Sequence, residues 1–179
     1  MSEGPSGSWD SPQVENFAGH VGRERHTSGE SAANGGGSRG GRDAADPDPA
    51  EVHGWYTSGM ELLGKGSPAA AAQVLQRAAN AEPGSRSIRE ALARAQFDTG
   101  QYEAAAANFR AIVDAAPADD YANFGLGLAL ARGGDHEAAA EYLALAAAMR
   151  PDRKPYTDAL RQVRATLKFR KQAPGEPPR

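Results

Sequence analysis

The 179-residue sequence contains no cysteine, which excludes disulfides, thiolate metal sites and cysteine nucleophiles. It also lacks long apolar runs, because the longest, Tyr142 to Met149, is far shorter than the roughly 18 residues that a membrane span needs. The N-terminus shows no basic segment followed by an apolar one, the pattern of a secretory signal. We therefore expect a soluble, cytoplasmic protein without a membrane partner.

Lysine is scarce, with four residues against sixteen arginines, whereas alanine and glycine are abundant. Arginine, alanine and glycine have GC-rich codons, so we expect a bacterial source with a GC-rich genome. Metal-binding patterns are also missing, because His20, His26, His53 and His136 do not have the spacing of ligands. The sequence thus predicts no cofactor, no metal site and no catalytic centre.

Large apolar side chains are rare in residues 1–51, which consist mainly of Gly, Ser, Asp, Glu and Pro. Such a segment cannot bury enough apolar surface to offset about 1–2 kcal/mol of backbone entropy per residue. We predict a disordered acidic tail over 1–51 and a second disordered segment over 172–179. The tail contains one apolar cluster, at Trp9, Val14, Phe17 and Val21.

Beyond residue 52 the sequence becomes rich in alanine, and its apolar residues recur at helical spacing between Gly and Pro breaks. No stretch shows the alternating β-branched pattern of a strand, so the sequence predicts an all-α fold. Four sets of residues repeat every 34 positions: Gly66, Gly100 and Gly134; Ala71, Ala105 and Ala139; Leu75, Phe109 and Leu143; Pro83, Pro117 and Pro151. The period defines three units, 52–85, 86–119 and 120–153.

Each repeated set has a physical reason. The small residues Gly59, Ala93 and Gly127 indicate close contact between two helices, because a mid-helix glycine costs about 1 kcal/mol unless packing requires it. The repeated glycines end the first helix of each unit with a left-handed residue, and the prolines end the second helix. Each unit is therefore predicted to be a helix-turn-helix pair.

This pattern resembles the tetratricopeptide repeat (TPR) family, whose 34-residue units read W-x2-L-G-x2-Y, then A-x3-F, then P. The units depart from that consensus at Ser58, where the family has Leu, and at Arg89 and Asn123, where it has Trp. The resemblance implies a right-handed superhelical solenoid of three repeats. Residues 154–171 have apolar residues at helical spacing and predict an amphipathic helix that caps the last repeat.

In the TPR family the first helix of each unit lines a concave groove. The resemblance assigns the following residues to that groove: Tyr56, Met60, Glu90, Arg94, Phe97, Tyr121, Phe124, Leu128 and Arg132. Some members hold a carboxylate with Lys, Asn and Arg in this groove, but Ala91 and Gly125 are among the residues at those positions here. The resemblance thus implies a non-catalytic adaptor that binds an apolar helix or extended segment of an unknown protein.

Two alternative functions follow from other features. The basic C-terminal helix is compatible with a nucleic-acid-associated protein, although the same charges suit a solvated cap. The chain is also compatible with an accessory subunit of an enzyme complex. Within the chain itself, the tail cluster around Phe17 is a candidate to contact the groove. Residues Gly59 to Gly66 resemble a phosphate-binding loop, but Gly66 replaces the Ser or Thr that binds magnesium.

Overall fold

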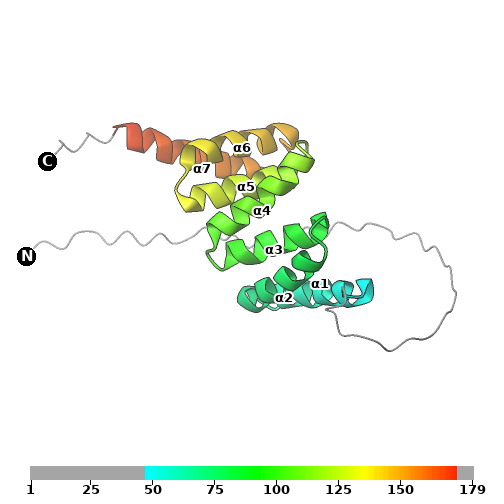
Figure 1. Cartoon of the computed structure of the whole chain (residues 1–179). Coiled ribbons are helices and arrows are strands. Elements are labelled where there is room, and N and C mark those ends of the chain that lie inside the picture. The colour runs from blue at the N-terminus through cyan, green and yellow to red at the C-terminus, as the bar shows by residue number, and fades with distance from the viewer. Residues whose placement is uncertain (1–46, 173–179) are drawn as a thin grey trace, which may run out of the picture. The chain divides into compact units, whose positions relative to one another are not determined.

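A computed structural model describes residues 47–172, which form seven α-helices and no strand (Figure 1). Their bounds are α1 (Pro49–Gly64), α2 (Pro68–Ala81), α3 (Arg86–Asp98), α4 (Tyr102–Ala115), α5 (Asp120–Gly133), α6 (His136–Met149) and α7 (Lys154–Gln172). Most of the predicted tail, residues 1–46, and the segment 173–179 lie outside the described residues. The all-α prediction is confirmed.

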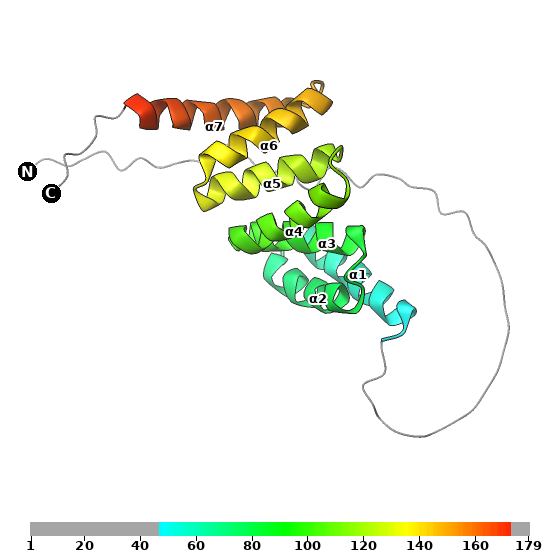
Figure 2. The same ribbon diagram turned by 45° about the horizontal axis from the view of Figure 1, so that its top comes forward.

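The helices form a right-handed solenoid, in which each helix packs against the next one along the chain (Figures 1 and 2). The first helices α1, α3, α5 and α7 also contact one another in sequence, whereas no such contact joins the second helices α2, α4 and α6. We call the surface formed by α1, α3 and α5 the first-helix face. The predicted groove residues all come from these three helices.

The helix ends follow from local chemistry. Asp119 and Asp135 cap α5 and α6, because each carboxylate accepts a hydrogen bond of 3.0 Å from a backbone N–H of the first turn. Gly66, Gly100 and Gly134 have φ of 71°, 79° and 96°, the left-handed conformation predicted for the residue that follows a first helix. The three repeated prolines come two residues after α2, α4 and α6 end.

Two predicted boundaries need correction. The tail was expected to extend to residue 51, but α1 begins at Pro49, where proline suits the first helical position and the Asp48 carboxylate accepts a hydrogen bond of 3.0 Å from the Ala50 N–H. The prediction placed Asp48 and Pro49 in the tail because the composition of this segment is typical of disorder. The C-terminal helix continues to Gln172, one residue beyond the predicted end.

The core is built where a large residue of a second helix meets small residues of first helices. Leu75, Phe109 and Leu143 are fully buried. A Cβ atom added to Gly127 would lie 2.6 Å from the Leu143 Cγ, so α5 and α6 touch through a position that admits no side chain. Gly59 meets Leu75 in the same way in the first repeat. The close helix contact predicted from these small residues is confirmed.

Helix α7 covers the end of the solenoid by packing on α6 and α5. Tyr156 and Val163 are buried on its inner side. The Tyr156 hydroxyl donates a hydrogen bond of 2.9 Å to the Asp120 carboxylate, and its ring stacks on Phe124 with a centroid separation of 4.4 Å. The predicted capping helix is therefore tied to the last repeat by burial, stacking and a hydrogen bond.

Candidate functional site

The first-helix face has a cluster of polar and aromatic side chains at its centre. We call Tyr56 of α1, Glu90 and Arg94 of α3, and Tyr121 of α5 the central cluster. All four side chains are only partly buried. Helix α3 contacts both α1 and α5, and the charges of Glu90 and Arg94 affect the pKa values of both tyrosines. The fold thus joins four of the predicted groove residues into one surface.

Partial burial changes the acidity of this cluster. Burial raises the pKa of the Tyr121 hydroxyl, against the opposing effect of the Arg94 guanidinium. Burial also raises the pKa of the Tyr56 hydroxyl, and the nearby Glu90 carboxylate raises it further. Both hydroxyls therefore stay protonated at neutral pH, where they can donate or accept hydrogen bonds.

A network of charges holds Glu90 at the edge of the cluster. The Arg86 guanidinium lies 3.8 Å from the Glu90 carboxylate and also pairs with Asp119, whose side chain is only 7 % exposed. Burial is the main cause that raises the pKa of Glu90, while Arg86 acts in the opposite direction. Burial thus disfavours the ionised form of the Glu90 carboxylate, and the nearby Arg86 guanidinium favours it.

The raised pKa of Glu90 predicts a pH dependence of stability. A carboxyl group with a raised folded-state pKa favours folding below its unfolded pKa, and this contribution is lost as the pH rises through the folded pKa. Glu90→Gln should therefore gain melting temperature relative to the parent chain between pH 4 and pH 7. Circular dichroism melts at both pH values measure the change, with Glu103→Gln on the exposed side of α4 as the control. If the melting temperatures of the two variants change equally between pH 4 and pH 7, the assigned effect of burial on Glu90 is contradicted.

The other groove residues divide by exposure. Phe97 and Phe124 are buried, with exposed fractions of 6 % and 8 %. The Phe97 ring meets the edge of Tyr102 at 5.4 Å, and Phe124 is covered by Tyr156 of α7. These two phenylalanines thus serve as core and offer almost no surface to a partner.

Met60 and Leu128 are partly buried, whereas Arg132 is exposed. Met60 and Tyr56 pack against the core cluster that contains Leu75, which restricts the surface that they present. The Arg132 guanidinium lies 5.9 Å from the centroid of the Phe97 ring. Arg132 is thus an exposed residue of α5 that lies near the Phe97 ring of α3.

Asp98 is one residue that the sequence interpretation missed. It lies at the end of α3, and its charge contributes to the raised pKa of Tyr121, so it is within electrostatic range of the central cluster. Its position was visible in the sequence, because Asp98 follows Arg94 by four residues and precedes Arg132 by one 34-residue repeat. Both carboxylates of this region, at positions 90 and 98, thus flank Arg94.

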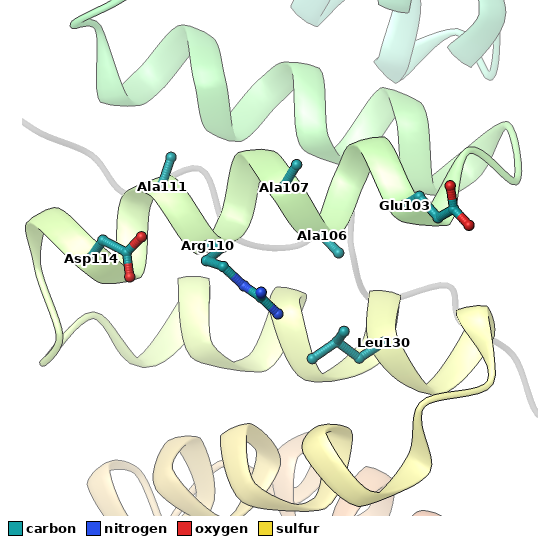
Figure 3. Close-up of a pocket in the computed structure, with 7 residues that line it drawn as sticks. All are labelled: Glu103, Ala106, Ala107, Arg110, Ala111, Asp114 and Leu130. Atoms are coloured by element: carbon teal, nitrogen blue, oxygen red, sulfur yellow. The ribbon is translucent and has the colours of Figure 1, made fainter.

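A separate depression of about 420 Å3 lies between α4 and α5 (Figure 3). Figure 3 shows Arg110 extending from α4 toward α5, while the methyl groups of Ala107 and Ala111 point to the opposite side of α4. The lining residues are Glu103, Ala106, Ala107, Arg110, Ala111, Asp114 and Leu130. None of them was predicted as a site residue. Three of these seven residues are charged and the other four are apolar.

Residues 47–172 contain no group of three or more His, Asp or Glu side chains arranged to hold a metal ion. Over the same range, no helix is both long enough and apolar enough to cross a bilayer.

Comparison with known proteins gives one family. A family model described as tetratricopeptide repeat matches residues 56–120 and again 90–154, which together span more than half of the chain. No curated protein matched the sequence in the corresponding search.

Solved structures share the architecture at low sequence identity. An RS-1 MamA double mutant is 24 % identical with a TM-score of 0.63, and the match covers 70 % of this chain and 68 % of that one. The Sgt2 TPR domain from Aspergillus fumigatus is 21 % identical with a TM-score of 0.63, covering 78 % and 92 %. The first TPR of Spaghetti (RPAP3), bound to an HSP90 peptide, is 17 % identical with a TM-score of 0.63, covering 69 % and 98 %. These matches show the fold alone.

Proposed function

Since the chain belongs to the tetratricopeptide repeat family, we propose that it is a non-catalytic adaptor that binds a segment of another protein on its first-helix face. The observation that carries this proposal is the central cluster, which spans three helices and stays partly exposed. Tyr and Arg side chains in such positions are typical anchors of protein interfaces. A similar fold, the first TPR of Spaghetti, holds a peptide.

The central cluster indicates what kind of segment would bind. Two protonated tyrosine hydroxyls and the Arg94 guanidinium supply hydrogen-bond donors, while Glu90 and Asp98 supply acceptors. Met60 and Leu128 add apolar surface beside them. We propose that the partner segment is mainly apolar with a few polar side chains that pair with the cluster. A bacterial source and a cytoplasmic location stay predictions, as do the alternatives of nucleic-acid association and an accessory role.

Selection from a displayed random-peptide library on the full chain tests this proposal. Tyr121→Phe removes only a hydroxyl, and Arg94→Met removes a charge while keeping an unbranched side chain. Each change should weaken the selected peptides by about 1–2 kcal/mol, roughly five- to thirtyfold in Kd by calorimetry. Melting curves of both variants establish whether the fold is retained.

The control variants carry the same changes on second helices: Tyr142→Phe on α6 and Arg110→Met on α4. They should bind the peptides like the parent chain. Some peptides could bind Tyr121→Phe and Arg94→Met as tightly as the parent chain but bind the control variants more weakly. That result would place the binding surface on the second helices instead. Failure to select any peptide would also count against the proposal.

A further inference from the structure

Helix α7 differs in charge from the rest of the described solenoid. It carries six basic residues and one acidic residue, Asp158, whereas residues 47–153 carry fourteen acidic and nine basic ones. All six basic residues are exposed. Five of them recur at helical spacing along one side of the helix, which we call the basic stripe: Lys154, Arg161, Arg164, Lys168 and Lys171.

The basic stripe lies on the side of α7 that has no helix partner among the described residues. Arg161 follows Gly127 by one 34-residue repeat, and Gly127 is the position at which α5 touches its paired helix α6. A charged arginine at this position prevents a second helix from packing equally closely. The stripe therefore forms the outer end of the solenoid rather than an interface with a further repeat.

The last turns of α7 project beyond the other helices in both views (Figures 1 and 2). Tyr156, Val163 and Arg170 are spaced by seven residues and lie on the same side of the helix. The first two are buried, whereas the Arg170 side chain is 57 % exposed, so burial on this side of α7 decreases toward the last turn. Phe169 is in this projecting turn and is 74 % exposed.

Few acidic groups neutralise this surface. Arg161 lies 3.0 Å from Asp158, and Arg170 lies 3.9 Å from Glu137 of α6. Within residues 47–172, no ion pair involves Arg164, Lys168 or Lys171. Phe169 is exposed in the last turn of α7 and lies next to Lys168 and Arg170 in the sequence, so the end of this helix combines an exposed aromatic ring with a cationic side.

We propose that the basic stripe and Phe169 dock this protein on the surface of an anionic lipid bilayer. Anionic headgroups attract clustered Lys and Arg side chains, and an aromatic ring among them can enter the boundary of the acyl chains. Such contact is peripheral and needs no membrane-spanning segment. This surface is separate from the first-helix face, and either proposal can fail without the other.

A bilayer fits this surface better than a single nucleic-acid strand does. Proteins that hold single strands use a basic groove with several aromatic platforms on which successive bases stack. The stripe follows the outside of a helix, and Phe169 is the single strongly exposed aromatic residue of the described chain. An exposed cationic helix side with one exposed aromatic residue suits the surface of an anionic bilayer.

Vesicle co-sedimentation of the full chain tests the proposal. Binding should occur to phosphatidylcholine vesicles that contain phosphatidylglycerol, should be absent with phosphatidylcholine alone, and should weaken as salt is raised. Replacing Arg164, Lys168 and Lys171 by Gln should reduce binding at least tenfold. Phe169→Ser should reduce it several-fold. These side chains are exposed, so circular dichroism should show an unchanged fold.

Control variants test whether vesicle binding depends on the position of these side chains or only on the total charge and exposed apolar surface of the protein. Replacing the exposed Lys65, Arg110 and Arg132 by Gln removes the same charge elsewhere, and Leu145→Ser removes the other strongly exposed apolar side chain. Both controls should bind vesicles like the parent chain. The proposal is overturned by equal loss in the controls, by equal binding to neutral vesicles, or by no vesicle binding. Stripe-dependent binding of a single-stranded oligonucleotide without vesicle binding would assign the surface to nucleic acid instead.

Discussion

A chain that ends after Arg153 should lose at least about 3 kcal/mol of unfolding free energy and should tend to aggregate. Removing α7 uncovers Phe124, which is 8 % exposed beneath the Tyr156 ring, and leaves the adjoining surface of α6 without its cover. Each large apolar side chain exposed to water costs about 1.5–3 kcal/mol. Circular dichroism melts and size-exclusion chromatography measure the two effects.

Two point variants at Tyr156 test the same contact in a chain that keeps α7. Tyr156→Ala removes the stack and the buried ring and should cost about 3–5 kcal/mol. Tyr156→Phe keeps the ring and removes only the hydrogen bond to Asp120, so it should cost about 1 kcal/mol. A truncated chain that melts like the parent, or equal effects of the two variants, would show that α7 does not stabilise the last repeat.

The second large effect is expected at Gly125. A Cβ atom at this position would lie 2.5 Å from the Cζ of Phe109, which is fully buried between the second and third repeats. Gly125→Ala forces that ring or the helix to shift and should destabilise the protein by about 1–3 kcal/mol. Gly54→Ala in α1 is the control, because an added Cβ there meets no atom within 4 Å. Removing the entropy cost of a helical glycine should make the control more stable by up to about 1 kcal/mol.

The preceding repeat suggests a rescue of Gly125→Ala. Leu75 and Ala91 precede Phe109 and Gly125 by 34 residues and pack in one core cluster. The double variant Phe109→Leu with Gly125→Ala recreates that pair, so its destabilisation should be at least about 1 kcal/mol smaller than the sum of the single effects. Denaturant unfolding of the four chains measures this coupling. Additive effects would show that the two positions do not share one contact.

The burial of Phe124 within the first-helix face depends on α7, a helix that lies outside the three repeats. Phe124 has the same place in its repeat as Tyr56 and Glu90, which are partly exposed. The periodicity therefore assigned all three to one surface. Phe124 is buried because α7 brings Tyr156 against it, a contact between residues 32 positions apart. A pattern within one helix does not show which neighbouring side chain covers it.

By itself, the sequence determined the helices, their pairing and the family. Those features depend on local chemistry, since Gly supplies the left-handed turn, Pro ends a helix and Asp caps one, and on a period that repeats three times without a gap. Only the tertiary structure decided which first-helix residues remain exposed and that the side chain of Phe169 on α7 stays uncovered. The exposure of a side chain depends on which other helices pack against it. That packing joins segments that are distant in the sequence, so the local sequence does not specify it.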